Sequence, residues 1–242
     1  MRTDILGVGF DNVTTKEAAG LAMEMISQRE RAYVVTPNPE IIWMCRKDPR
    51  LREAIGGAAL VLPDGVGVTL GARILGRPLR SRAPGVDFFA ELVANLAPAR
   101  GRIFLLGARP GVAEEAARNL SVQYPGIAVV GTRDGYFDDD REVIRIINEA
   151  APDLLAVCLG SPRQELWMAQ NAPLLDVPLS AGLGGTLDVI SGRVRRAPVL
   201  WQKLGIEWLY RLIREPRRLR RIVKLPAYLF AVSLSALRGT RK

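Results

Sequence analysis

RIFLLGARPGVAEEAARNL, residues 102–120, indicates the fold class of this chain. The stretch begins with an apolar run of strand length at residues 103–106, passes through a turn bounded by Gly107 and Gly111, and continues as an amphipathic helical pattern. A buried strand followed directly by a helix is half of a βα unit. Such units are typical of a parallel sheet whose two faces are covered by helices.

The same alternation of apolar runs and helical patterns recurs along the chain. Six more runs of strand length occupy residues 5–8, 32–35, 58–62, 127–130, 154–159 and 179–183. A chain of 242 residues that is 48% hydrophobic is large enough to bury a substantial core. We therefore predict an α/β protein with a Rossmann-like, mostly parallel sheet covered by helices.

Turns rich in glycine and proline follow most of these predicted strands. They occupy residues 36–40, 63–65, 107–111, 131–135, 160–162 and 184–186. In an open α/β sheet the loops at the carboxyl ends of the strands gather at one edge, where ligands bind. We expect these turns to face one cleft. The turn at residues 107–111 could hold a phosphate at the start of the following helix, but its pattern fits plain βα geometry equally well.

The chain contains no histidine, and this limits its chemistry. Ser-His-Asp and Cys-His catalysis are excluded, as are histidine general bases and most zinc sites. Cys45 and Cys158 are far apart and flanked by apolar residues, so we interpret them as small buried hydrophobes. The N-terminal segment carries Asp4 and Asp11 and has no apolar signal-peptide core, which predicts a cytoplasmic protein.

Positive charge is concentrated at the C-terminal end. Residues 193–242 carry 14 Lys and Arg against two acids, a net charge of +12, whereas residues 1–192 carry a net charge of −3. We therefore divide the chain into a body, residues 1–196, and a helical appendage, residues 197–242, that is suited to phosphates or an anionic membrane. Residues 225–237 are uncharged, but a helix of that length is only about 20 Å long and cannot span a bilayer. It either lies in the headgroup plane or packs on the body.

Several polar residues at the predicted strand ends have two interpretations. Asp64 follows an apolar strand between Pro63 and Gly65, where it could act as a general base or cap the next helix. Thr36 and Asn38 lie in a neighbouring turn, either as caps or within reach of Asp64. Arg82 by itself is better explained as a surface residue. Three consecutive acids at residues 138–140 could bind a metal, but capping of the following helix is the simpler account.

Eight motifs in order along the chain resemble those of the WecG/TagA/CpsF family of bacterial glycosyltransferases. They are TPNPEI (36–41), LPDGVGV (62–68), RAPGVD (82–87), LLGARPGVAEEA (105–116), GYF (135–137), LGSPRQELW (159–167), GLGGTLDVISGRVRRAP (182–198) and GIEWLYRLIREPRRLRR (205–221). The resemblance covers essentially the whole chain and is closest to the TagA-like N-acetylmannosaminyltransferases of that family.

The resemblance implies an inverting, UDP-sugar-dependent hexosyltransferase that acts on the cytoplasmic face of the membrane. It implies that Asp64 is the catalytic base and that appendage arginines complete the active site. The implied arginines are Arg211, Arg218 and Arg221, and the implied pocket residues are Thr36, Asn38, Arg82 and Gln164. For the nucleotide we expect contacts from Gly107, Tyr136, Gly160, Gly185 and Asp188, with the arginines taking the charge of the leaving diphosphate.

The resemblance also implies the partners of the protein. The donor would be UDP-N-acetylmannosamine and the acceptor polyprenyl-diphosphate-linked GlcNAc, in teichoic acid or surface polysaccharide synthesis. Residues 197–242 would bind an anionic membrane, and we expect no metal and no other cofactor. UDP-glucose or a UDP-uronic acid is the alternative donor, and self-association stays open. A basic-tailed RNA-binding protein is the alternative class, which we disfavour because residues 225–237 suit a lipid interface better than RNA.

Overall fold

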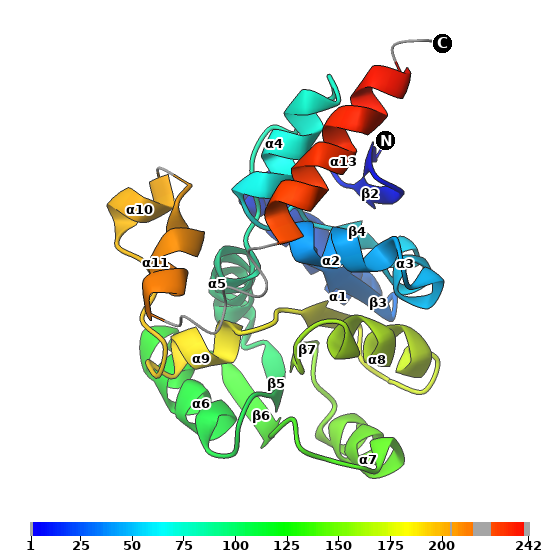
Figure 1. Cartoon of the computed structure of the whole chain (residues 1–242). Helices are drawn as coiled ribbons and strands as arrows, with labels where there is room; N and C mark the ends of the chain where they lie inside the picture. The colour runs from blue at the N-terminus through cyan, green and yellow to red at the C-terminus, as the bar shows by residue number, and fades with distance from the viewer. Residues whose placement is uncertain (1, 204, 215–223, 240–242) are drawn as a thin grey trace.

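The computed structural model describes residues 2–203, 205–214 and 224–239. Its centre is a six-stranded parallel sheet with the strand order β4-β3-β8-β7-β5-β6 (Figure 1). The strands are β3 (Ala32–Val35), β4 (Leu60–Val61), β5 (Arg102–Gly107), β6 (Ala128–Arg133), β7 (Leu154–Cys158) and β8 (Leu179–Gly182). The predicted α/β class and parallel sheet are confirmed.

The first predicted strand is wrong. Residues 5–8 do not form a strand of the central sheet; the chain instead forms an antiparallel hairpin of β1 (Thr3–Ile5) and β2 (Val8–Phe10). Leu6 and Gly7 form its turn, and both have positive φ angles, 54° and 86°. Such a turn reverses the chain within two residues, which an apolar run read as one continuous strand does not reveal.

Helices cover both faces of the central sheet. One face carries α2 (Pro39–Cys45), α3 (Pro49–Gly56), α7 (Asp140–Ala150) and α8 (Arg163–Asn171), and the other carries α1 (Thr15–Gln28), α5 (Gly85–Leu96), α6 (Val112–Gln123) and α9 (Thr186–Ile190). A short 3₁₀ helix, Ala97–Ala99, follows α5. Neighbouring strand residues point to opposite faces, so Val35 joins the first apolar cluster and Val34 the second.

The acidic run before α7 caps that helix. The Asp139 carboxylate accepts hydrogen bonds from the backbone N–H groups of Arg141, at 2.8 Å, and Glu142, at 3.4 Å. Asp140 accepts a hydrogen bond from the indole N–H of Trp167 at 2.9 Å. The capping interpretation is therefore confirmed, and two of the three acids have a structural use.

Among the described residues, four helices lie outside this layered arrangement: α4 (Val66–Ile74), α10 (Val199–Lys203), α11 (Glu207–Arg214) and α13 (Lys224–Gly239). In Figure 1, α13 runs beside α4 and touches α2, whereas α10 and α11 lie to the left of them, above α9. Within the part of the chain that the structure describes, no helix has both the length and the apolar character needed to cross a membrane.

The contact between α13 and the body is close because two glycines of α4 face it. Tyr228 and Val232 of α13 are fully buried, and the Tyr228 hydroxyl donates a hydrogen bond to the Gly67 carbonyl at 3.2 Å. A Cβ atom at Gly71 would lie 2.3 Å from that hydroxyl oxygen. One face of α13 thus packs on the body, while Phe230, Leu234 and Leu237 on the same helix remain exposed.

Candidate active site

The loops that follow β3 and β4 are joined by backbone hydrogen bonds. The Asp64 N–H donates to the Pro37 carbonyl at 3.2 Å, and the Ala83 N–H donates to the Pro63 carbonyl at 2.8 Å. The turn at residues 36–38, the loop that carries Asp64 and the segment around Arg82 therefore meet at the carboxyl edge of the sheet. That edge is where an open α/β sheet binds its ligands.

Asp64 does not cap the helix after it. The N-cap of α4 is Gly65, which has a φ of 91° and provides no side-chain cap. The capping alternative for Asp64 is therefore wrong. A positive φ at the neighbouring position favours glycine, so Gly65 allows the sharp turn that carries Asp64 from the sheet edge into α4.

Thr36 holds the ends of two strands together. Its hydroxyl donates a hydrogen bond to the Gly182 carbonyl at the end of β8, at 3.0 Å, and its side chain is 6% exposed. A Cβ atom at Gly85 would lie 3.2 Å from the same hydroxyl, so the first turn of α5 also packs closely here. Thr36 therefore connects β3, β8 and α5 at the candidate site.

Asn38 is the N-cap of α2, as its capping interpretation predicts. Its Oδ1 accepts hydrogen bonds from the backbone N–H groups of Glu40, at 2.9 Å, and Ile41, at 3.1 Å. Arg82 is part-buried, and its guanidinium donates a hydrogen bond to the carbonyl of Gln202 in α10. Arg82 is thus more than a surface residue, because it ties the body to the C-terminal segment.

Gln164 is buried and holds the loop between β8 and α9. Its Oε1 accepts a hydrogen bond from the Gly184 N–H at 3.0 Å, and its Nε2 donates to the Glu165 carboxylate at 2.9 Å. The Ser161 hydroxyl donates to the same carboxylate oxygen at 2.7 Å. Burial raises the pKa of Glu165, and the hydrogen bonds from Ser161 and Gln164 offset part of that rise. Glu165 lay inside a recognised motif, but the sequence pattern did not single it out.

Gly107, at the end of β5, is predicted to contact the nucleotide, and the backbone around it also requires a glycine. Gly107 has a φ of 124°, and a Cβ atom there would lie 2.4 Å from the backbone carbon of Cys158. The adjacent Ala108 N–H donates to the Cys158 carbonyl at 3.0 Å, and the Ala108 carbonyl accepts from the Gly135 N–H at 2.9 Å. Tyr136 follows this contact and is 69% exposed. The loops after β5, β6 and β7 therefore meet.

The remaining predicted nucleotide contacts flank α8 and α9. Gly160 precedes α8, and its carbonyl accepts a hydrogen bond from the Gln164 N–H at 2.9 Å. Gly185 is the N-cap of α9. Asp188 lies in α9, and its backbone carbonyl accepts a hydrogen bond from the Val194 N–H at 2.9 Å. These three residues are thus on the same edge of the sheet as Thr36 and Gln164.

An ion pair that sequence reasoning missed joins the body to the segment before α10. Arg196 donates to both carboxylate oxygens of Asp87, at 2.5 and 2.7 Å. Burial lowers the pKa of the Arg196 guanidinium, but the hydrogen bonds and charge of Asp87 and the charges of Glu207 and Asp64 raise it above its ordinary value. Arg196 therefore lies within electrostatic reach of the candidate base. Its motif, GRVRRAP, was visible in the sequence, but its partner 109 residues away was not.

Two of the three appendage arginines implied by the resemblance, Arg218 and Arg221, lie outside the described residues. The third, Arg211, is placed by its backbone in α11. In the described ranges, with their gaps at 204 and 215–223, no three Cys, Asp or Glu side chains gather in a way that could hold a metal ion.

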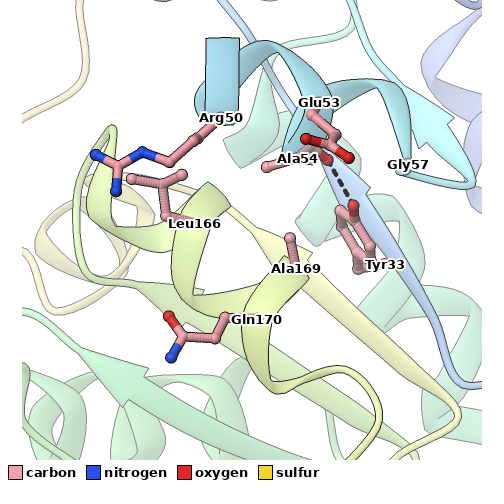
Figure 2. A pocket seen from close by; sticks show the side chains of 8 residues that line it. All are labelled: Tyr33, Arg50, Glu53, Ala54, Gly57, Leu166, Ala169 and Gln170. Carbon is pink, nitrogen blue, oxygen red and sulfur yellow. Dashed lines mark hydrogen bonds between the residues drawn. The ribbon is translucent and has the colours of Figure 1, made fainter. Parts of the chain in front are cut away.

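A cavity of about 490 Å³ lies away from this edge, between α3 and α8. Figure 2 shows its lining, in which the Tyr33 hydroxyl donates a hydrogen bond to the Ala54 carbonyl. Arg50, Glu53 and Gln170 supply its other polar side chains. None of the predicted site residues lines it, so we do not assign the active site to this cavity.

Comparisons with known proteins agree with the resemblance. The family model described as "Glycosyl transferase WecG/TagA/CpsF family" matches residues 3–242. Relatives named N-acetylglucosaminyldiphosphoundecaprenol N-acetyl-beta-D-mannosaminyltransferase are similar to this chain. The relative from Bacillus spizizenii is 36% identical over 92% of this chain and 86% of its own length, and the one from Bacillus subtilis is 38% identical over 88% and 83%. The relative from Staphylococcus aureus is 32% identical over 96% and 92%. The chain therefore belongs to the WecG/TagA/CpsF family of glycosyltransferases.

Proposed function

We propose that this protein transfers N-acetylmannosamine from a UDP-sugar to polyprenyl-diphosphate-linked GlcNAc, with inversion of the anomeric centre, in teichoic acid or related surface polysaccharide synthesis. The observation that carries the proposal is the shared name of relatives that match nearly the full length of this chain at 32–38% identity. The name of those relatives specifies the transferred sugar and the lipid-linked acceptor. The donor nucleotide and the mechanism are the proposal's own.

Asp64 is the general base in this mechanism. It takes the proton from the acceptor hydroxyl as that oxygen attacks the anomeric carbon, and the bond from that carbon to the diphosphate oxygen breaks on the opposite side. Support comes from the position of Asp64 at the carboxyl edge of β4, hydrogen-bonded through its backbone to the turn that contains Asn38. The histidine-free sequence leaves a carboxylate as the natural choice for this role.

The polar residues around Asp64 position the substrates. Asn38 uses Oδ1 for its cap, so Nδ2 is the atom with which it would donate to a sugar hydroxyl. Thr36 and Gln164 hold the loops after β3 and β8 in place by hydrogen bonds, and Arg82 holds α10 against the body. Preorganised loops of this kind lower the cost of placing two substrates for an in-line reaction.

The negative charge that grows on the leaving UDP needs cationic partners. Arg211, Arg218 and Arg221 of the appendage would supply them, together with backbone N–H groups of the glycine-rich turns. Gly107, Tyr136, Gly160, Gly185 and Asp188 surround the edge where the nucleotide would lie. In this scheme residues 1–196 form the catalytic body and residues 197–242 complete the site.

The appendage also carries the proposed membrane contact on the inner face of the cell membrane. Phe230, Leu234 and Leu237 project from α13 as exposed apolar side chains, and Arg238 lies in its last turn. An apolar helix face flanked by basic residues suits the headgroup region of an anionic bilayer. The protein would then reach its lipid-linked acceptor without spanning the membrane.

A donor panel tests the proposal. The purified full chain is incubated with a short-chain lipid-diphosphate GlcNAc analogue and one donor in each reaction: UDP-N-acetylmannosamine, UDP-GlcNAc, UDP-glucose or a UDP-uronic acid. The masses of the products are then measured by mass spectrometry. We expect a product heavier by one N-acetylhexosamine residue with UDP-N-acetylmannosamine only. Product with UDP-glucose or the uronic acid would reassign the donor, and no product with any donor would remove the proposal.

A further inference from the structure

A second cavity, of about 310 Å³, lies where the turn after α9 meets the end of α11. We call it the arginine pocket; its lining consists of Gly192, Arg193, Val194, Arg195 and Arg214. Three of these five residues are arginines, and none is acidic. A concave site with several cations and no lining carboxylate is built for an anion.

The turn that carries Arg193 and Arg195 is fixed by the body. Gly192 has a φ of 81°, which reverses the chain at the end of α9. The Val194 N–H then donates to the Asp188 carbonyl at 2.9 Å, so the turn folds back onto α9. Both arginines are therefore held at defined backbone positions before any ligand arrives, which reduces the entropy lost on binding.

The arginine pocket also adjoins the glycine-rich turn after β5. The Arg193 guanidinium lies 3.2 Å from the position that a Cβ atom would take at Gly111, the N-cap of α6. The positive end of the α6 dipole thus faces the same region. In Figure 1, α6, α9 and α11 come together on this side of the molecule.

The side chains that line the arginine pocket differ in their partners. Arg193 forms an ion pair with Glu115 through Nε at 2.9 Å, and both side chains are partly exposed. Arg214 stacks over the Tyr210 ring at 5.8 Å. Arg195 makes no ion pair with any residue that the structure describes. The residues that line the pocket thus include three guanidinium groups and no carboxylate.

We propose that the arginine pocket binds a diphosphate ester. The identity of that ester rests on the proposed function. Guanidinium groups match phosphate oxygens in planar, paired hydrogen bonds. The volume of about 310 Å³ lies at the lower end of the range for small-molecule sites and exceeds what a bare diphosphate fills, which leaves room for an attached organic group.

Two diphosphate esters take part in the proposed reaction, the nucleotide sugar and the lipid-linked acceptor. The test therefore measures binding of inorganic diphosphate, UDP, uridine and a short-chain prenyl diphosphate to the full chain by calorimetry at constant ionic strength. The variant is Arg193→Gln/Arg195→Gln. The matched control is Arg31→Gln/Arg145→Gln, which removes the same charge from two exposed arginines with ion pairs of 2.9 and 2.8 Å elsewhere on the surface.

We expect the pocket variant to bind inorganic diphosphate at least tenfold more weakly than the wild type. The pocket variant should bind uridine, and the control variant should bind diphosphate, within twofold of the wild-type affinity. Weakened UDP binding would assign the pocket to the donor, weakened prenyl diphosphate binding to the acceptor, and weakening of both to a site that they share. Equal diphosphate binding by the wild type and the pocket variant would overturn the proposal. So would an equal loss in the control variant.

Two further measurements separate the alternatives. Arg195→Gln alone, which breaks no ion pair among the described residues, should weaken diphosphate binding at least threefold, so misfolding of the double variant leaves the proposal testable. Sedimentation with phosphatidylglycerol vesicles should be the same for the pocket and control variants; a loss of vesicle binding with intact diphosphate binding would overturn the proposal. These titrations need no sugar transfer, so failure of the donor panel would leave their outcome unaffected.

Discussion

Arg196 and Asp87 form a two-bond ion pair, with Nη1 to Oδ1 at 2.5 Å and Nη2 to Oδ2 at 2.7 Å. The pair connects the first turn of α5 to the segment before α10, and Asp64 is among the charges that act on the guanidinium. A single arginine thus joins α5 to the segment before α10. Its Nε is buried and has no partner among the described residues, so its two Nη bonds fix its position.

Breaking this pair should destabilise the protein. We expect Arg196→Met and Asp87→Asn each to lower the free energy of unfolding. The coupling energy in a double-mutant cycle should be about 1–3 kcal/mol, because charge-assisted hydrogen bonds at a part-buried site contribute more to stability than surface ion pairs do. Urea unfolding measures this coupling energy. The exposed pair Arg31 and Asp176 is the control, with an expected coupling below about 0.5 kcal/mol. Equal couplings for the two pairs would contradict the special position of Arg196.

Asp64→Asn should abolish sugar transfer while UDP binding survives. An asparagine keeps the size of the side chain but cannot take a proton, and general bases contribute roughly 10²–10⁴-fold to rates. Turnover with the lipid-linked analogue and calorimetry with UDP give the two readouts. Asp138→Asn, at an exposed position before α7, is the control and should keep full turnover. Near-normal turnover of Asp64→Asn would remove Asp64 from the mechanism.

Gly71→Ala should loosen α13 from α4. The new Cβ would lie 2.3 Å from the Tyr228 hydroxyl, which is itself buried, so the overpacking should cost about 1–3 kcal/mol. Hydrogen exchange of residues 224–239 reports the detachment. Gly20→Ala is the control, because Gly20 is exposed in the middle of α1 and a Cβ there meets nothing within 4 Å; it should stabilise by about 0.5–1 kcal/mol. Unchanged exchange in Gly71→Ala would show that Tyr228 can move aside.

Glu165→Gln should stabilise the protein at neutral pH. Burial raises the pKa of Glu165 in the folded state, so its ionisation favours the unfolded chain, and this cost appears as the pH rises above the ordinary carboxyl range. A glutamine keeps an acceptor for Ser161 and Gln164 without the charge. The gain over wild type should therefore be present at pH 8 and shrink as the pH falls toward 4.5. Urea unfolding at several pH values measures it, and a gain that is constant with pH would exclude a titration effect.

Sugar transfer should continue in EDTA. Asp139 and Asp140, the acids that the metal alternative needs, are engaged in capping α7 and in accepting a hydrogen bond from Trp167. In the proposed mechanism, arginines and backbone N–H groups stabilise the charge of the leaving diphosphate. Activity that collapsed in EDTA and returned with Mg²⁺ or Mn²⁺ would restore the metal alternative for residues 138–140.

The sequence by itself determined the features that depend on neighbouring residues. Residues 32–35 were predicted as a strand with the bounds that β3 has, and the Asn38 and Asp139 caps follow from side chains that bond the backbone two or three residues ahead. The family also followed from the sequence, because ordered motifs need no coordinates. Hydrophobic periodicity and capping are local, and local patterns are written in consecutive residues.

Only the tertiary structure decided which distant residues meet. The Arg196–Asp87 pair, the Tyr228 hydroxyl against Gly67 and Gly71, and the arginine pocket join segments that are far apart along the chain. The N-terminal apolar run shows the same limit at short range, because two residues with positive φ turned a predicted strand into a hairpin. Such contacts depend on the path of the whole chain through the sheet, and composition or spacing does not encode that path locally.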